Sequence, residues 1–144
     1  MRQANGSQYV SALLVSADPQ NRLLIRNIFR DAGWRLFEAR DRKGALDCLE
    51  RQPLQVVMTN AHLPKWPWNM ALEDLQRMPC PPQLVVTSRI ADDSLWAEVL
   101  NSGGYDVLAE PFDRSEVERV IASARRYFDP PIAHMAPVQA AAAS

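Results

Sequence analysis

Four polar side chains stand at the ends of short apolar runs and are the candidates for chemistry: Ser16, Asn60, Thr87 and Glu110. They offer two hydroxyls, one amide and a single carboxylate, a set suited to hydrogen bonding among protein groups. The amide of Asn60 can donate to the carboxylate of Glu110, and the two hydroxyls can complete a metal-free network. The alternative interpretation is that the four side chains are solvated separately at the rim of a cleft.

The same set lacks what metal-assisted chemistry needs. Mg²⁺ prefers several anionic oxygen ligands, so one carboxylate with neutral neighbours predicts weak or absent Mg²⁺ binding. Asp18 lies nearby in the sequence, but its place directly before Pro19 predicts a helix cap rather than a metal ligand. His62 stands in a loop without an organised base, and no Ser-His-Asp or Cys-His arrangement is evident. We therefore expect no catalytic residue, no cofactor and no metal.

The elements that must position these side chains alternate regularly along the chain. Five short apolar runs predict strands, and the stretches between them have helical periodicity. The expected strands are 13–15, 34–38, 56–59, 84–86 and 105–109, and the expected helices begin near residues 19, 44, 69, 93 and 114. This order, with short connections, predicts an α/β fold with a doubly wound, five-stranded parallel sheet covered by helices on both faces. Ligands of such sheets bind at the carboxyl ends of the strands, where the four polar side chains fall.

Helix boundaries and apolar faces are also readable. Gly33 is placed to close the first helix, and Asp113 with Glu116 predicts a capping box for the last. The apolar face expected for the first helix is Leu24, Ile25, Ile28, Phe29 and Ala32, and that for the fourth is Leu95, Trp96, Val99 and Leu100.

Composition favours one ordinary globular domain. The 144 residues are 47% hydrophobic and 23% charged, with a formal net charge of −1, which does not point to a nucleic-acid or membrane partner. We expect a flexible start over 1–10, a domain over 11–128, and a flexible Pro- and Ala-rich tail or linker over 129–144. No signal peptide or bilayer-spanning run is evident, so a cytoplasmic protein is expected. Cys48 and Cys80 are expected to be separate thiols.

Five short motifs carry a resemblance to a known family. They are Leu14-Val15 followed by Asp18-Pro19; Gly33, Ala39 and Ala45-Leu46; Asn60 with Pro64; Thr87-Ser88; and Glu110-Pro111-Phe112. In this order and spacing the chain resembles the receiver domains of two-component response regulators, between residues 11 and 128. The resemblance implies a flavodoxin-like (CheY-like) fold with strand order 2-1-3-4-5 and five helices in three layers.

The resemblance also implies a set of chemical groups that this chain has largely lost. In a working receiver, two acidic residues and an aspartate hold Mg²⁺, the aspartate accepts the phosphoryl group, and a hydroxyl and a lysine contact its oxygens. The matching positions here are Ser16, Ala17, Asn60, Thr87 and Glu110. Only Thr87 keeps its functional group, and the neutral amide of Asn60 cannot form an acyl phosphate. The pattern predicts a degenerate receiver, or pseudo-receiver.

A switch position and a docking surface follow from the same resemblance. Val107 takes the place of the aromatic side chain that changes rotamer in many relatives, and valine has no comparable swing. Arg22, Arg26 and Arg30 are spaced to form a basic stripe along the first helix. The stripe is either a solvated helix face or a surface that docks a histidine kinase or phosphotransfer protein.

Two tryptophans flank Pro67 in the loop after the third strand. Trp66 and Trp68 either pack over the degenerate pocket and exclude water, which we favour, or form an exposed contact for a partner.

The leading functional hypothesis is a non-phosphorylatable signalling domain, not an enzyme, that binds a protein: a sensor kinase, a regulator or an output domain. The resemblance places a possible homodimer contact on the fourth helix, fifth strand and last helix. The alternatives are a receiver that responds to a small ligand or to atypical phosphorylation, and a flavodoxin-like cofactor protein. The last is disfavoured because the segment 16–20 contains no glycine to cradle a phosphate.

Overall fold

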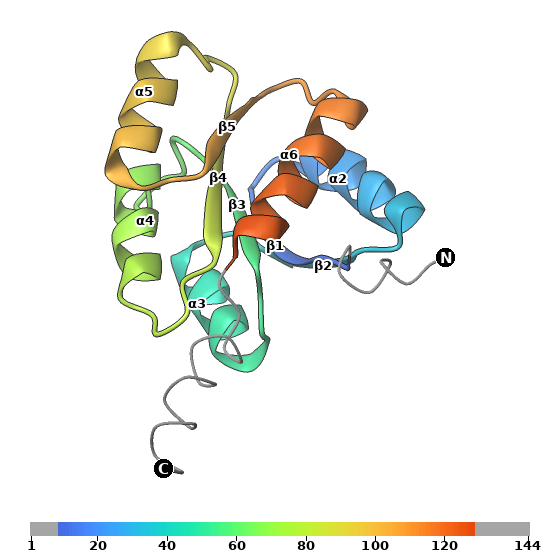
Figure 1. Ribbon diagram of the computed structural model, residues 1–144, viewed down its shortest axis with the longest axis horizontal. Helices are drawn as coiled ribbons and strands as arrows, with labels where there is room; N and C mark the ends of the chain where they lie inside the picture. The colour runs from blue at the N-terminus through green and yellow to red at the C-terminus, as the bar shows by residue number, and fades with distance from the viewer. Residues whose placement is uncertain (1–8, 129–144) are drawn as a thin grey trace, which may run out of the picture.

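A computed structural model of the chain describes residues 9–128 and contains the predicted parallel sheet. Its strands are β1 (Ser11–Val15), β2 (Arg35–Ala39), β3 (Val56–Asn60), β4 (Gln83–Ser88) and β5 (Asp106–Ala109). All neighbours pair in parallel, in the order β2-β1-β3-β4-β5 (Figure 1). The predicted fold class and strand order are therefore confirmed.

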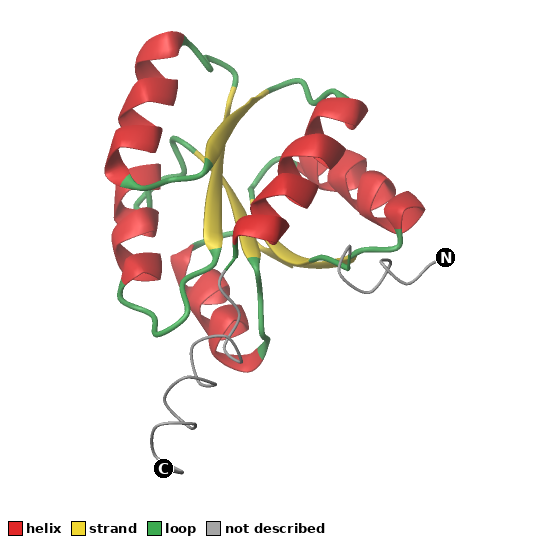
Figure 2. Ribbon diagram, viewed as in Figure 1, coloured by secondary structure: helices red, strands yellow, loops and turns green. Residues whose placement is uncertain are grey.

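The helices of residues 9–128 cover the sheet on both faces. They are α2 (Pro19–Ala32), α3 (Arg42–Arg51), α4 (Trp68–Gln76), α5 (Asp93–Ser102) and α6 (Arg114–Tyr127). Figure 2 shows the sheet nearly edge-on, with α3, α4 and α5 on one side and α2 and α6 on the other. None of these helices has the length and apolar character needed to cross a membrane.

Each strand supplies both halves of the core because successive side chains point to opposite faces of a sheet. In β1, Leu13 and Val15 pack beneath α3, α4 and α5, whereas Ala12 and Leu14 pack beneath α2 and α6. All residues of β1 are buried, as expected for a central parallel strand. This double burial fixes the position of every strand end, and with it the site.

The capping residues predicted for α2 and α6 are found at the ends of these helices. The side chain of Asp18 accepts from the backbone N–H groups of Gln20 and Asn21 at the start of α2, and Gly33 closes that helix with a φ of 76°. Asp113 accepts from the Glu116 N–H at the start of α6. In the described residues the return bond from the Glu116 side chain is absent, so only half of the predicted capping box forms.

Three sequence expectations need correction. Ala32 is exposed rather than part of the buried face of α2, because the helix ends there and turns away from the sheet. Trp96 is 49% exposed, since it projects from the outer side of α5 while Leu95 and Val99 face the core. Val10, expected in the flexible start, is fully buried, and its carbonyl accepts from the Arg35 N–H. Residues 1–8 and the expected tail, 129–144, lie outside the described part of the chain.

Among the side chains of residues 9–128, one buried polar atom has no hydrogen-bond partner. The side chain of Thr59 is fully buried, and its Oγ1 makes no hydrogen bond. A buried hydroxyl without a partner costs about 1–3 kcal/mol relative to its hydrated state.

We predict that Thr59→Val raises the free energy of unfolding by about 1 kcal/mol, because it removes the unpartnered hydroxyl while keeping the branched shape. Thr59→Ser is the matched control: it keeps the hydroxyl, loses a buried methyl group, and should destabilise the fold. Urea unfolding measures both. A valine variant less stable than the wild type contradicts the prediction.

Candidate functional site

A polar cleft lies at the carboxyl ends of the strands, where the topology of the sheet favours a site. It has a volume of about 360 Å³ and is lined by Asp18, Asn21, Asn60, His62, Ser88, Arg89, Ile90 and Glu110. Its side chains come from the β1–α2 junction, the ends of β3 and β4, and the residue after β5. Of the predicted pocket residues, Asn60 and Glu110 line the cleft.

The predicted hydrogen bond between these two residues is present. Asn60 Nδ2 donates to Glu110 Oε2 over 3.0 Å, so an amide and a carboxylate join the ends of β3 and β5. Asn60 Oδ1 meanwhile accepts from the backbone N–H of His62 at 2.9 Å. Both ends of the amide are therefore occupied by groups of the protein itself.

A second amide completes the arrangement. Asn21 Nδ2, on the first turn of α2, donates to Glu110 Oε1 over 2.9 Å. The carboxylate of Glu110 thus bridges α2 and β3, accepting one hydrogen bond on each oxygen. Sequence reasoning missed Asn21, because nothing in its local context distinguishes it from an ordinary polar residue on a helix.

The hydroxyls expected in this network take no part in it. Ser16 Oγ accepts from the Asp18 N–H at 3.1 Å and shapes the β1–α2 turn. Among residues 9–128, neither Ser16 nor Thr87 forms a side-chain hydrogen bond with Asn60 or Glu110. The prediction of a four-member network was wrong in this part, since Ser16, just after β1, and Thr87, on β4, are both buried and only the longer side chains reach across the cleft. Ala17 is exposed and adds no polar group.

A cation at the rim was also missed. Arg89, directly after β4, places Nη2 3.8 Å from Oδ2 of Asp18. The Arg89 side chain is 80% exposed, so this pair contributes little to stability. It does set the charge of the rim: the cleft is lined by the carboxylates of Asp18 and Glu110 and one exposed guanidinium.

These residues do not fit a magnesium ion. Mg²⁺ needs an octahedral set of oxygen ligands that are free to face it. Asp18 caps α2, both oxygens of Glu110 accept from amides, and Asn60 Oδ1 accepts from a backbone N–H. No group of three or more potential metal-ligating side chains occurs in the described chain.

Trp66 does not cover the cleft as favoured from the sequence. It is fully buried in the core beneath α3, α4 and α5, and its Nε1–H donates to Asp74 Oδ2 over 2.8 Å. Trp68 opens α4 and packs half-buried against the same core. Neither lines the cleft, and Trp66 cannot serve as an exposed partner contact. The reason is that the loop after β3 directs the Trp66 side chain beneath α4, and this course of the loop depends on tertiary packing.

Asp74 is the polar anchor of that loop. Burial by itself raises the pKa of Asp74, but hydrogen bonds from Trp66 and Arg42 and the charges of Arg42 and Arg77 outweigh it, so its pKa is lowered. Arg42 Nε lies 3.0 Å from Asp74 Oδ2 and connects the start of α3 to α4.

The basic stripe on α2 is partly committed to the fold. Arg26 donates two hydrogen bonds to Glu38 on β2, and Arg22 Nε lies 3.8 Å from the same carboxylate. The hydrogen bond and charge of Glu38 raise the pKa of Arg26. Arg30 is 71% exposed and lies 3.5 Å from Asp31. The stripe thus loses part of its positive field to Glu38.

The remaining singled-out residues have simple surroundings. Val107 is buried in the core beneath α3, α4 and α5. Cys48 and Cys80 are half-buried free thiols, and burial raises the pKa of Cys48.

The sequence model of the response regulator receiver domain matches residues 12–122, most of the chain. The chain belongs to this family. Receiver domains are signalling modules of two-component systems, and the cleft described above lies where their strand ends converge. A sequence comparison with well-characterised proteins finds no match.

Solved receiver structures share the fold. Full-length FixJ from B. japonicum matches with a TM-score of 0.76 and 22% identity, over 93% of this chain and 66% of that chain. A further match is the receiver domain of the sensor histidine kinase PA1611 from Pseudomonas aeruginosa, which has a magnesium ion in its active-site cleft. It matches with a TM-score of 0.70 and 24% identity, over 81% of this chain and 97% of that chain. The Saccharomyces cerevisiae Ssk1 receiver domain, crystallised with the phosphotransfer protein Ypd1, matches with a TM-score of 0.69 and 16% identity, over 79% of this chain and 87% of that chain.

We predict that Asn60→Asp destabilises the fold at neutral pH by about 1–3 kcal/mol, because it replaces an amide donor by a second carboxylate about 3 Å from Glu110. The repulsion raises the pKa of the pair in the folded state, so the loss should diminish as the pH falls through that raised pKa. Adding Glu110→Lys to Asn60→Asp restores opposite charges and should recover stability. Urea unfolding of the three proteins tests this, and an Asn60→Asp variant as stable as the wild type at pH 7 contradicts it.

We also predict a pH-dependent contribution from Asp74. Because the folded-state pKa of Asp74 is lowered, its ionised carboxylate stabilises the fold above the unfolded-state pKa of about 3.9. This stabilisation is lost as the pH falls through the folded-state pKa. Asp74→Asn, which still accepts from Trp66, is the control. The stability difference between the two proteins should be largest near neutral pH and shrink below about pH 4. A difference that stays constant over this range refutes the assignment.

Proposed function

We propose that this receiver acts without phosphorylation, as a module that binds another signalling protein. The observation that carries the proposal is the bonded set of Asn60, Glu110 and Asn21. The phosphoacceptor position holds an amide, and the position of the lysine holds a carboxylate that faces it at 3.0 Å.

The chemistry of an aspartyl phosphate is incompatible with this arrangement. Phosphoryl transfer requires a carboxylate nucleophile and cations that neutralise the developing charge on the phosphoryl oxygens. An amide nitrogen or oxygen does not form the acyl phosphate, and Glu110 adds negative charge where the phosphoryl oxygens would lie. With Mg²⁺ binding weak or absent, nothing in the cleft offsets that charge except the exposed Arg89.

The hydrogen bonds of Glu110 with Asn60 and Asn21 would also hold the strand ends in one conformation. In a relative that is switched by phosphate, the contact between the strand ends depends on phosphorylation. Here Glu110 connects α2 and β3 through neutral amides, which keep their protons across the physiological pH range. Val107 adds to this, because it has no large ring to reorient. The domain would therefore present one constant surface to its partner.

The partner is a protein: a sensor kinase, a regulator or an output domain. The Ssk1 receiver, crystallised with the phosphotransfer protein Ypd1, supports a protein partner for this fold. Candidate contacts are the exposed part of the α2 stripe, chiefly Arg30 and Arg26, and the face of α5, β5 and α6, which could also support a homodimer. The domain catalyses no reaction, binds no nucleic acid and works in the cytoplasm.

We predict that incubation with acetyl phosphate and Mg²⁺ adds no phosphoryl group to the protein, as measured by intact mass. The matched control carries four substitutions that restore the family's groups: Ser16→Asp, Ala17→Asp, Asn60→Asp and Glu110→Lys. This variant should gain one phosphoryl group in a Mg²⁺-dependent manner. A stoichiometric adduct on the wild-type chain would overturn the proposal, and Asp18 and His62 would be the first residues to map.

A further inference from the structure

Acidic and basic residues are distributed unevenly along the sequence. Residues 90–113 contain no lysine, arginine or histidine and six carboxylates, which are Asp92, Asp93, Glu98, Asp106, Glu110 and Asp113. This segment thus carries a formal charge of −6, whereas the whole chain carries −1. It forms α5 and the edge strand β5.

A groove lies between this acidic segment and the first turn of α6. It has a volume of about 340 Å³ and is lined by Ala91, Asp92, Asp93, Trp96, Val107, Ala109 and Glu116. Short apolar side chains supply part of the lining, and three carboxylates surround them. No cation lines it. A partner that fills this groove would need an apolar side chain together with positive charges around it.

Trp96 gives the groove a large exposed aromatic surface. Its side chain is 49% exposed, and its Nε1–H donates to Asp106 Oδ1 over 3.2 Å, which orients the ring. A tryptophan held at its edge can accept an arginine or lysine against its face, an interaction that the neighbouring carboxylates reinforce. Exposed tryptophans in such positions often dominate the energetics of protein interfaces.

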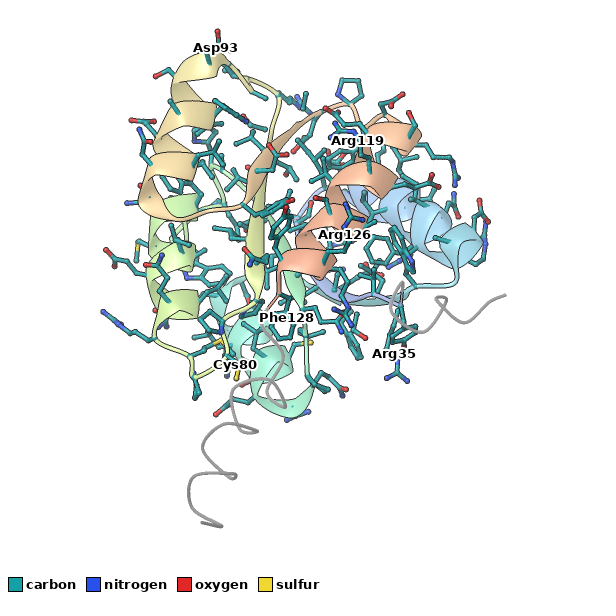
Figure 3. All side chains as sticks on the ribbon, in the orientation of Figure 1. Arg35, Cys80, Asp93, Arg119, Arg126 and Phe128 are labelled. Atoms are coloured by element: carbon teal, nitrogen blue, oxygen red, sulfur yellow. The ribbon has the colours of Figure 1, made fainter. Side chains whose placement is uncertain are left out.

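The carboxylates around the groove are not neutralised within the domain. Among residues 9–128, Asp92, Asp93, Glu98, Asp106 and Glu116 have no ion-pair partner within 4.0 Å. By contrast, Glu38 on the opposite edge of the sheet is paired with two arginines. Figure 3 shows Asp93 at the tip of α5 and Arg119 on α6, the helix that also carries Glu116. Arg119 is not among the residues that line the groove. The groove therefore keeps a negative field that attracts cations.

We propose that the groove formed by Trp96, Val107 and Glu116 binds a basic amphipathic segment of a partner protein. An apolar side chain of that segment occupies the groove, and flanking arginines or lysines contact Asp93, Glu116 and the indole of Trp96. This proposal rests on the proposed function as a protein-binding module, and it specifies the chemistry of the partner.

The test is a titration of the full chain with a synthetic helical peptide that has one leucine face and one arginine face, followed by ¹H–¹⁵N NMR. We expect shifts confined to the groove, including the indole N–H of Trp96, and affinity that falls as salt increases. A second peptide, in which glutamate replaces every arginine, should not bind.

Variants assign the site. Asp93→Asn with Glu116→Gln should weaken binding roughly fivefold or more, and Trp96→Ala should weaken it further. Glu50→Gln with Glu73→Gln removes the same charge from exposed positions on α3 and α4 and should leave affinity unchanged. None of these side chains is buried in the core, so the variants should fold.

Three outcomes overturn the proposal: no binding of the arginine peptide, shifts spread over other surfaces, or equal weakening by both pairs of variants. Light scattering of the protein alone provides a fourth, because a dimer disrupted by Trp96→Ala would identify a second copy as the occupant. Failure of the proposed function is distinguishable, since a phosphoryl adduct would appear in the mass measurement whether or not the peptide binds.

Discussion

The burial of a parallel sheet on both faces is the constraint on which the rest of the molecule depends. Parallel strands expose backbone and side chains on two sides, so helices must cover both. The helices α3, α4 and α5 cover one face, and α2 and α6 cover the other. Because each helix connects one strand to the next, all strands run in one direction and end at the same edge. Side chains far apart in sequence, such as Asn60 and Glu110, meet there without any local signal that joins them. The site is therefore a consequence of the packing of the core.

At that edge the protein supplies its own connections. A receiver that works by phosphorylation gathers negative charge that a metal ion offsets. Here one carboxylate accepts from the amides of Asn60 and Asn21, so side chains of the protein itself connect the strand ends to α2. Hydrogen bonds to a charged acceptor contribute more than neutral ones, on the order of 1.5–3 kcal/mol each before allowance for partial exposure. The exchange of an acid for an amide and of a cation for an acid reverses the polarity of the pair while it keeps the attraction.

The two edges of the sheet differ in how their charged side chains are paired. On the β2 edge, Glu38 is enclosed by Arg22 and Arg26, so charge there is used to hold α2 against the sheet. On the β5 edge, the carboxylates around Trp96 have no such partners in the described chain. Charges paired within a domain contribute little field at a distance, whereas unpaired ones steer association. Among the described residues, the β5 edge accordingly keeps the stronger negative field.

The fold and the residue types at the strand ends could be predicted from the sequence, because both depend on local patterns. Alternating apolar runs, helix caps such as Asp18 and Gly33, and the residue types at strand ends can be read without coordinates. The resemblance to receivers also predicted the bond between Asn60 and Glu110, because it brings the carboxyl ends of β3 and β5 to one site. Tertiary structure decided the rest. The role of Asn21 depends on how α2 lies against the cleft, and the burial of Trp66 depends on how one loop folds beneath α4. Such contacts join segments that are distant in the chain, and only the packing of the helices on the sheet determines which side chains reach one another.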